Sequence, residues 1–194
     1  NLNITDNLEL AGNVWKPILE YAESLNVKIA IENCPMLFTE DEWPGGKNIA
    51  VSPAIWRELF KRLPSEYLGL NFDPSHFIWQ EMDYIRPLYE FKDKIFHVHY
   101  KDIRVDKEAR NEVGVLATPL SYMVPCIPGH GDVNWARYIS ALLEIGYQGA
   151  ACIEVEDKSF EDNNENIENS LKISRQYLKQ FIHFPEKGRQ YAKD

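Results

Sequence analysis

The sequence predicts an α/β fold built around a parallel β-sheet. Four short apolar runs with the character of buried strands are separated by longer segments whose apolar residues recur at helical spacing. Strands that alternate with helices are joined by right-handed crossovers, which makes neighbouring strands parallel. Each apolar run also ends in a carboxylate or an imidazole. The polar residues therefore fall at the carboxyl ends of the strands, where parallel sheets bind their ligands.

The first three elements follow from periodicity and from helix capping. A helix is expected over residues 8–25, where apolar side chains return on one side. The first strand covers residues 28–33 and reads KIAIEN. The next helix begins after Ser52, a suitable N-cap, with Pro53 in its first position, and continues to about residue 63.

Two further strands lie in the middle of the chain. They cover residues 67–72 (YLGLNF) and 95–100 (IFHVHY). A helix over residues 83–91 separates them, and Pro87 either kinks this helix or delays its start.

A long connection, residues 101–132, follows the third strand. Connections of this length in a compact domain are usually functional. A helix over residues 135–145 then ends at Gly146, the fourth strand covers residues 149–155, and an amphipathic helix covers residues 163–182.

The polar residues at the strand ends are the feature that points to chemistry. Burying a charge costs several kcal/mol unless the charge is paired or binds a metal. Because parallel strands end at the same edge of a sheet, these side chains are expected to converge, most simply around a divalent cation. The residues concerned are Glu32, Asp73 with His76, His97 with His99, and Glu154 with Glu156.

Bulk composition restricts the class of protein. The 194 residues suffice for one domain, 1–194, with a substantial core. A net charge of −9 argues against a nucleic-acid partner, and no apolar run approaches the roughly 20 residues that span a membrane. Three widely spaced cysteines without a CxxC pair indicate free thiols, and hence the cytoplasm.

Several motifs together resemble a known family. The segments IENCP, GLNFDPSH, HVHYKD, PGHGDVNW and GYQGAACIEVED are similar to those of the sugar phosphate isomerase/epimerase superfamily, the xylose isomerase-like TIM barrels. The resemblance covers most of residues 27–157 and implies a TIM (β/α)8 barrel of which this chain supplies about strands 5–8, the C-terminal half. It further implies that the N-terminal half comes from a missing segment, from another chain or through a homo-oligomer. One departure is IEVED at the last strand, where many relatives read IEHED.

The resemblance also implies a set of site residues. Its metal ligands fall on Glu32, Asp73, His99 and Glu154. This oxygen and nitrogen set suits Mn²⁺ best, with Mg²⁺, Co²⁺ and Zn²⁺ as alternatives. The expected substrate contacts are His76, Lys101, Asp102 and Arg104, with Trp79 stacking on a sugar face. By contrast, His97 is expected to be a hydrogen-bonded histidine, and Glu156 a salt-bridge residue.

The function so implied is a metal-dependent sugar, sugar phosphate or keto-inositol isomerase or epimerase. Glu32 and Glu154 would remove and return the proton next to the carbonyl through a metal-stabilised enediolate. Phe38, Trp43, Tyr122 and Met123 are candidates for a lid that keeps out water.

Two alternatives remain open. An inosose-type dehydratase or a keto-glycoside-cleaving lyase would use the same first step. A truncated half barrel that binds a sugar or a partner without turnover is the non-enzyme alternative.

Overall fold

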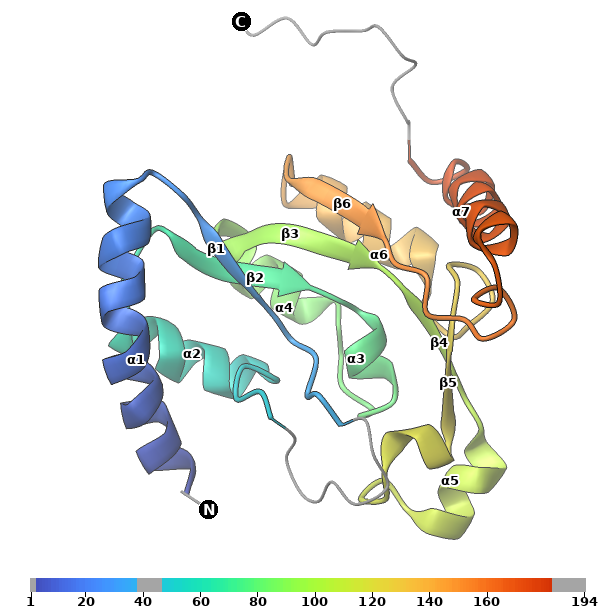
Figure 1. Cartoon of the computed structure of the whole chain (residues 1–194), viewed down its shortest axis with the longest axis horizontal. Coiled ribbons are helices and arrows are strands. Elements are labelled where there is room, and N and C mark those ends of the chain that lie inside the picture. Colours follow the sequence, from blue (N-terminus) through green and yellow to red (C-terminus); the bar gives the residue numbers. More distant parts are fainter. Residues whose placement is uncertain (1–2, 38–46, 183–194) are drawn as a thin grey trace, which may run out of the picture.

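A computed structural model describes residues 3–37 and 47–182 of the chain (Figure 1). Within them, four strands form a parallel sheet in the order β1-β2-β3-β6. Each expected strand is present, with its ends displaced by no more than two residues from the prediction. The strands are β1 (Ile29–Glu32), β2 (Leu68–Phe72), β3 (Ile95–Tyr100) and β6 (Ala150–Ile153).

The predicted helices are also present. They are α1 (Ile4–Ser24), α2 (Pro53–Arg62), α4 (Arg86–Glu90), α6 (Trp135–Glu144) and α7 (Asn164–Leu178). The side chain of Ser52 accepts a hydrogen bond from the Ile55 amide and caps α2 as expected. The helix predicted over 83–91 is shorter, because Pro87 lies in its first turn, where no amide hydrogen is needed.

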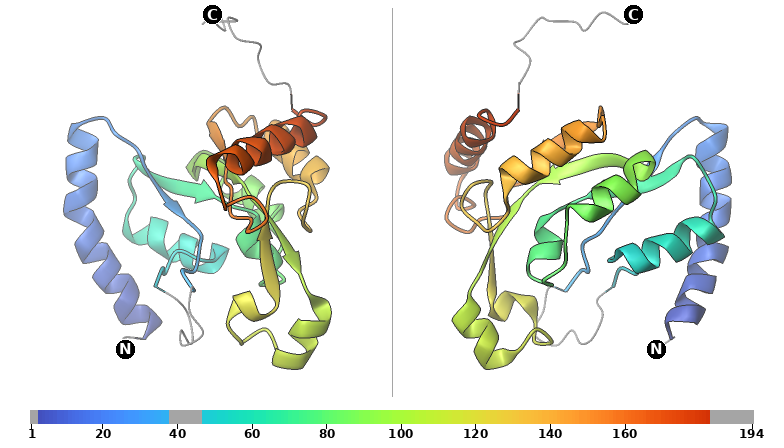
Figure 2. Two further views of the ribbon diagram at one scale, coloured as in Figure 1. Left: turned by 45° about the vertical axis from the view of Figure 1, so that its right-hand side comes forward. Right: turned by 180° about the vertical axis from the view of Figure 1, so that it is seen from behind.

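Helices α2, α4 and α6 cover one face of the sheet, as the right-hand view of Figure 2 shows. Alternate residues of β2, namely Leu68, Leu70 and Phe72, are buried in the core that this face forms with the helices. Because strand residues alternate between faces, Asn71 and Asp73 are directed away from the helices. The sheet therefore separates an apolar core from the face that carries the polar groups.

The connection over residues 101–132 is not the irregular loop that the sequence suggested. It contains β4 (Asp102–Val105) and β5 (Met123–Cys126), which pair as an antiparallel hairpin. Between them lie helix α5 (Lys107–Val113) and a 3₁₀ turn, Pro119–Ser121. A further short helix, α3 (Ser75–Ile78), follows β2.

Strands β1 and β6 are the outer strands of the sheet, and each pairs on one side only within the described residues. Helix α1, beside β1, carries a stripe of exposed apolar side chains: Leu10, Val14, Ile18, Tyr21 and Leu25. Among the described residues, no helix has the length and apolar character that a membrane span requires.

Candidate metal centre

The four parallel strands end on the same side of the sheet, toward the β4–β5 hairpin (Figure 1). Glu32 is the last residue of β1, His99 lies near the end of β3, and Asp73 and Glu154 follow β2 and β6 directly. The strand register thus brings together, from four separate segments, the four residues expected to ligate a metal.

The four side chains lie close enough together to hold a cation. One donor atom from each of Glu32, Asp73, His99 and Glu154 lies within 4.8 Å of the others. His99 Nδ1 is 3.0 Å from Glu154 Oε2 and 3.6 Å from Glu32 Oε1. Three carboxylates and one imidazole are ligands suited to Mn²⁺, Mg²⁺ or Zn²⁺.

Buried polar atoms without hydrogen bonds show that the set fits a cation. Asp73 Oδ2, His99 Nδ1 and Glu154 Oε2 are all buried and, within the described part of the chain, have no hydrogen-bond partner. Such atoms are rare in folded proteins because each costs free energy, and a bound ion would remove that cost.

Asp73 is held by its neighbours in a way that leaves one oxygen free. Its amide donates to Asn33 Oδ1 (2.8 Å), and its carbonyl accepts from Asn33 Nδ2 (2.9 Å). Its Oδ1 accepts from the Ser75 amide at 2.8 Å. The backbone and one carboxylate oxygen are therefore fixed, and Oδ2 is directed at the cluster.

The charges of the cluster lower the pKa of Glu32 and raise the pKa values of His99 and His76 in the metal-free state. Burial opposes ionisation of Glu32, but the imidazoles of His76 and His99, 3.4 Å and 3.6 Å from its Oε1, hold its pKa far below the ordinary value. For His99, burial is outweighed by Glu154 and Glu32, which raise its pKa to about 10. Burial of His76 is likewise outweighed, chiefly by Asp73, and its pKa rises to about 9.

Lys101 supplies a permanent positive charge beside the acids. Its side chain is almost fully buried, and Nζ lies 3.6 Å from Asp73 Oδ2, 3.5 Å from Glu154 Oε2 and 3.0 Å from Glu156 Oε2. Burial alone would lower its pKa, but these carboxylates raise it above the ordinary value. The expected salt-bridge role of Glu156 is confirmed by this contact.

Asn71 links the two histidines of β3. Its Nδ2 is 3.0 Å from His99 Nε2, and its Oδ1 is 2.8 Å from His97 Nδ1. His97 is thus hydrogen-bonded, as predicted. A cation bound by His99 Nδ1 would leave the ring proton on Nε2, which faces Asn71 Nδ2, so the amide of Asn71 would have to turn its oxygen toward His99 and its NH₂ group toward His97. The orientation of this one amide therefore couples the tautomers of both rings.

A pocket of about 140 Å³ opens beside the cluster. Glu32 and Glu154 line it, as do three of the five residues expected to contact substrate: His76, Trp79 and Lys101. Its apolar walls come from the hairpin and from the segment after β1, through Leu37, Ile103, Leu120, Met123 and Pro125.

The expected lid is placed only in part. Met123 lines the pocket, whereas Tyr122 is buried in a small core with Trp79 and Ile103. Phe38 and Trp43 lie outside the described residues.

Asp102 and Arg104 do not line this pocket. The Asp102 carboxylate accepts hydrogen bonds from the amides of Ile103, Gly129 and Val133 and from Trp135 Nε1, at 2.8–3.0 Å. It is fully buried, so the structure gives it an anchoring role in place of the expected substrate contact. Arg104 is exposed on β4.

Two residues of the site, Asn71 and Cys34, were missed from the sequence. Asn71 shares a strand face with Asp73, and this alternation was the available signal for it. Cys34 lines the pocket and lies near His76 and Glu32. A cysteine two residues beyond a strand carries no signal of its own, and only the folded chain brings it to the site.

A larger cleft, of about 710 Å³, lies between α1 and residues 62–65. It contains none of the clustered metal donors found among the described residues. The pocket beside the strand ends is therefore the candidate site despite its smaller volume.

Comparison with known proteins gives one family. A family profile described as "Xylose isomerase-like TIM barrel" matches residues 3–179. The uncharacterised protein YfiH of Bacillus subtilis is 30% identical over 186 residues, covering 90% of this chain and 53% of that protein. An inosose dehydratase of Lactiplantibacillus plantarum is 27% identical over 117 residues, covering 59% of this chain and 38% of that protein.

Solved structures agree on the fold. The crystal structure of the IolI protein with a bound zinc atom superposes with a TM-score of 0.67 at 19% identity, covering 95% of this chain and 60% of that chain. Epimerases and dehydratases both occur among the other structural neighbours. The chain spans about half the length of the curated relatives that it matches.

Proposed function

Because this chain belongs to the xylose isomerase-like TIM barrel family, we propose that it is part of a metal-dependent isomerase or epimerase. The substrate would be a sugar, a sugar phosphate or a keto-inositol, and the first step the removal of a proton next to its carbonyl. The observation that carries the proposal is the set of four donor atoms at four strand ends, three of them buried without hydrogen bonds.

The cation would be held by Glu32, Asp73, His99 and Glu154. Mn²⁺ is the ion we propose, with Mg²⁺, Co²⁺ and Zn²⁺ as alternatives, because the set contains oxygen and nitrogen donors only. When bound, such an ion polarises a substrate carbonyl and makes the adjacent C–H group more acidic.

Glu32 and Glu154 are the proposed proton-transfer pair. Both line the pocket and both have a lowered pKa, so they are ionised at neutral pH. For Glu154 the main cause is the close contact of its Oε2 with the imidazole of His99, 3.0 Å away. A carboxylate with a lowered pKa is a weak base, so a water-poor site helps it to abstract a proton.

The pocket walls supply that environment. Trp79, Ile103 and Met123 add apolar surface to the pocket that the acids line, and Lys101 lies 3.5 Å from Glu154 and balances part of the negative charge. At about 140 Å³ the pocket is smaller than the 300–1,000 Å³ typical of drug-sized ligands. This volume favours a small substrate whose polar end meets the acids.

A dehydratase is the second candidate. The similarity to inosose dehydratases favours it. The proton would be removed by the same carboxylate, and a hydroxyl group on the next carbon would then leave. A keto-glycoside-cleaving lyase would differ only in the leaving group.

We further propose that the described sheet corresponds to strands 5–8 of a barrel. Its outer strands β1 and β6 have open edges, and α1 exposes an apolar stripe. Four more β/α units would satisfy these edges, provided by a preceding segment, by another chain or by a second copy. The native mass of the protein distinguishes a preceding segment of the same chain from a partner chain or a second copy. A stable monomer of this chain alone, with both sheet edges open, would contradict the proposal.

The three cysteines are free thiols, which supports the cytoplasmic location that we propose.

The reaction is tested by incubating a panel of keto-sugars with the protein and Mn²⁺ in D₂O and reading them by NMR. Deuterium at the carbon next to the carbonyl, without loss of water, supports the epimerase or isomerase. Deuterium together with an unsaturated product supports the lyase. Glu154→Gln should abolish exchange, whereas Glu161→Gln, on the exposed surface, is the matched control. Absence of exchange with every substrate would count against both candidates.

A further inference from the structure

Three helices of the structure end in the same backbone motif. Helices α1, α3 and α6 are each closed by two hydrogen bonds, one from a residue in the left-handed conformation and one from the residue after it. At the end of α3, the amides of Glu81 and Met82 donate at 3.0 Å and 2.9 Å to carbonyl groups in the last turn of the helix. Asn26 and Gly146 occupy the position of Glu81 at the ends of α1 and α6.

Glu81 is the unexpected residue among these three. Its φ is +56°, in a region that residues with a Cβ atom rarely adopt. Glycine adopts this conformation without strain, and asparagine is the other residue commonly found at such helix ends. Gly146 and Asn26 follow that rule, whereas Glu81 does not. Because a strained residue persists only where its surroundings hold it, the contacts of the Glu81 side chain are of interest.

The Glu81 carboxylate is paired with an arginine of the segment between β4 and β5. Arg110 Nη1 lies 2.6 Å from Glu81 Oε1, and the Arg110 side chain is only 19% exposed. Arg110 belongs to α5, whereas Glu81 belongs to the turn after α3, which follows strand β2 of the parallel sheet. The ion pair therefore joins the parallel sheet to the hairpin, two parts that share no strand pairing among the described residues.

The ion pair lies close to the contacts that place the hairpin at the pocket. Trp79, two residues before Glu81, packs in a small core with Ile103 and Tyr122. Trp79 and Ile103 also line the pocket, as does Met123. The position of α5 relative to the turn after α3 therefore affects how closely the hairpin side chains approach the rest of the pocket.

We propose that Glu81 is a positioning residue, retained in a strained conformation because its carboxylate, through Arg110, holds the hairpin residues of the pocket in place. Glu81 belongs neither to the donor cluster nor to the pocket lining, so it acts only through the hairpin. The consequence for a substrate rests on the function proposed above, whereas the placement of the hairpin can be tested without turnover.

Two substitutions separate the backbone strain from the ion pair. Glu81→Gln removes the charge and keeps the strain, whereas Glu81→Gly removes both. The amides of residues 106–122, followed by hydrogen–deuterium exchange and mass spectrometry, should exchange about two- to fivefold faster in both variants, the range expected for a partly exposed ion pair. Glu58→Gln, which breaks a surface pair with Arg62 on α2, is the matched control and should leave these amides unchanged.

Stability should separate the two variants. In urea denaturation, the folding equilibrium constant of Glu81→Gly should be about fivefold larger than that of Glu81→Gln, because glycine adopts the left-handed conformation without strain. Glu81→Gly would thus be the more stable protein with the less protected hairpin, a combination that loss of an ordinary structural salt bridge does not produce. If Glu81→Gly were no more stable than Glu81→Gln, the proposal would fail.

Charge reversal tests the partner. Glu81→Arg and Arg110→Glu should each speed the exchange of residues 106–122, because each places two like charges together. The double variant should restore the exchange rate of the unaltered protein. A double variant that exchanges as fast as the single variants would show that Arg110 is not the residue through which Glu81 acts.

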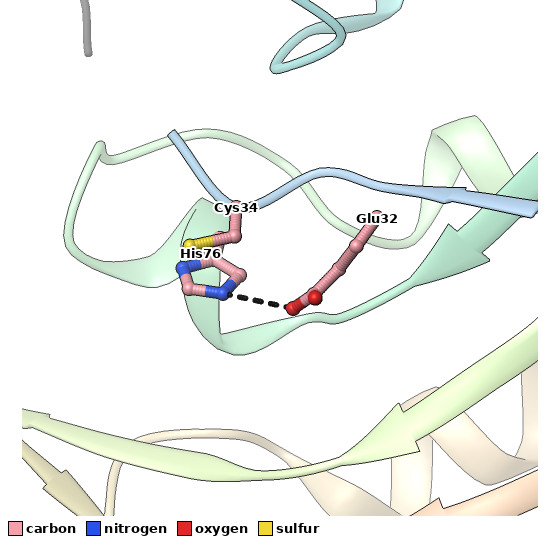
Figure 3. Close-up of side chains that lie close together, drawn as sticks. All are labelled: Glu32, Cys34 and His76. Carbon is pink, nitrogen blue, oxygen red and sulfur yellow. Dashed lines mark ion pairs between the residues drawn. The ribbon is translucent and has the colours of Figure 1, made fainter. Parts of the chain in front are cut away.

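A thiol in the pocket reports whether the pocket itself changes. Cys34 lines the pocket beside Glu32 and His76 (Figure 3), whereas Cys152 is exposed and outside the pocket lining. N-ethylmaleimide should modify Cys34 about two- to fivefold faster in Glu81→Gln than in the unaltered protein, with the rate at Cys152 unchanged. An unchanged rate at Cys34 would overturn the link between the ion pair and the pocket.

These measurements need neither metal nor substrate, so the two proposals can fail separately. Unchanged exchange and labelling in Glu81→Gln, with Mn²⁺ binding intact in the unaltered protein, would reject the positioning role alone. Faster labelling of Cys34 in a protein that exchanges no substrate deuterium would instead reject the proposed reaction and support the positioning role.

Discussion

Two aspartates with the same burial have opposite environments. Asp73 and Asp102 are both 0% exposed, and each lies at or just beyond the end of a parallel strand. Asp102 accepts four hydrogen bonds, from its neighbour Ile103, from the loop over 129–133 and from Trp135. Asp73 Oδ2 has no hydrogen bond within the described chain and faces other charged groups. A buried carboxylate whose hydrogen bonds are complete holds the fold, whereas one left incomplete is available to a cation.

The largest effect that follows from this difference is expected for Asp73→Asn. The substitution keeps the shape and the Oδ1 acceptor but removes the charge at the cluster. We expect Mn²⁺ affinity to fall by more than the roughly 100-fold that a change behind the ligands costs. Isothermal titration calorimetry measures this, and an affinity within about threefold of the original would show that Asp73 is not a ligand.

Asp102→Asn is expected to act on stability and not on metal. An amide group in place of one oxygen would face amide and indole donors, leaving buried groups unsatisfied. We expect a loss of about 2–3 kcal/mol in the free energy of unfolding. Urea denaturation of the metal-free protein measures it. If Asp73→Asn were the more destabilising of the two, the contrast between the aspartates would be wrong.

Asn71→Ala tests the residue that orients His99. Because the amide fixes the ring tautomer, its loss should weaken Mn²⁺ binding by about 10–100-fold. The NMR signals of the imidazole nitrogens report the tautomer directly. If the tautomer of His99 changed but the Mn²⁺ affinity did not, the hydrogen bond from Asn71 would contribute nothing to metal binding.

The smallest effect concerns pH. Burial lowers the pKa of His99, but Glu154 and Glu32 outweigh it and raise the value to about 10 in the metal-free protein. Ligation needs the neutral ring, so binding below pH 10 expels a proton and affinity should rise about tenfold per pH unit. Calorimetry in buffers of different ionisation enthalpy counts the protons. Asp102→Asn should leave the slope unchanged.

The raised pKa of His99 also affects the stability of the metal-free protein, which should fall as pH rises, whereas metal affinity should increase. Without metal, the charged ring of His99 stabilises the folded state fully below its ordinary pKa. That contribution is lost as pH rises through about 10.

The parallel sheet and the convergence of polar residues at its strand ends could be predicted because they depend on local patterns, whereas the choice of Glu32, Asp73, His99 and Glu154 among them came from the family resemblance. Alternating strands and helices, and the polar residue that ends each strand, are visible in neighbouring letters of the sequence. The role of Asp102 could not be predicted in this way. Asp102 follows a strand as Asp73 does, and only the return of residues 129–133 completes its hydrogen bonds. Gly131 permits that return, since a Cβ there would collide with the Asp102 carboxylate.

The β4–β5 hairpin was missed for a related reason. Its strands are four residues each and are separated by α5 and a 3₁₀ turn, so no tight-turn signal joins them. β5 also contains Pro125, a residue that is disfavoured inside strands. β4 and β5 pair with each other although residues 106–122 separate them in the sequence, so neighbouring letters do not reveal the pairing.

The separation of the hairpin from the strand ends has an evolutionary consequence. The acids follow or end strands of the parallel sheet, but part of the apolar lining of the pocket comes from Ile103, Met123 and Pro125 on the hairpin, which pairs only with itself among the described strands. Insertions or substitutions between β4 and β5 can therefore alter which molecules fit the pocket without moving the four clustered donor residues. Selection, or an engineer, could change the apolar lining of the pocket in this hairpin while the four clustered donor residues stay in place.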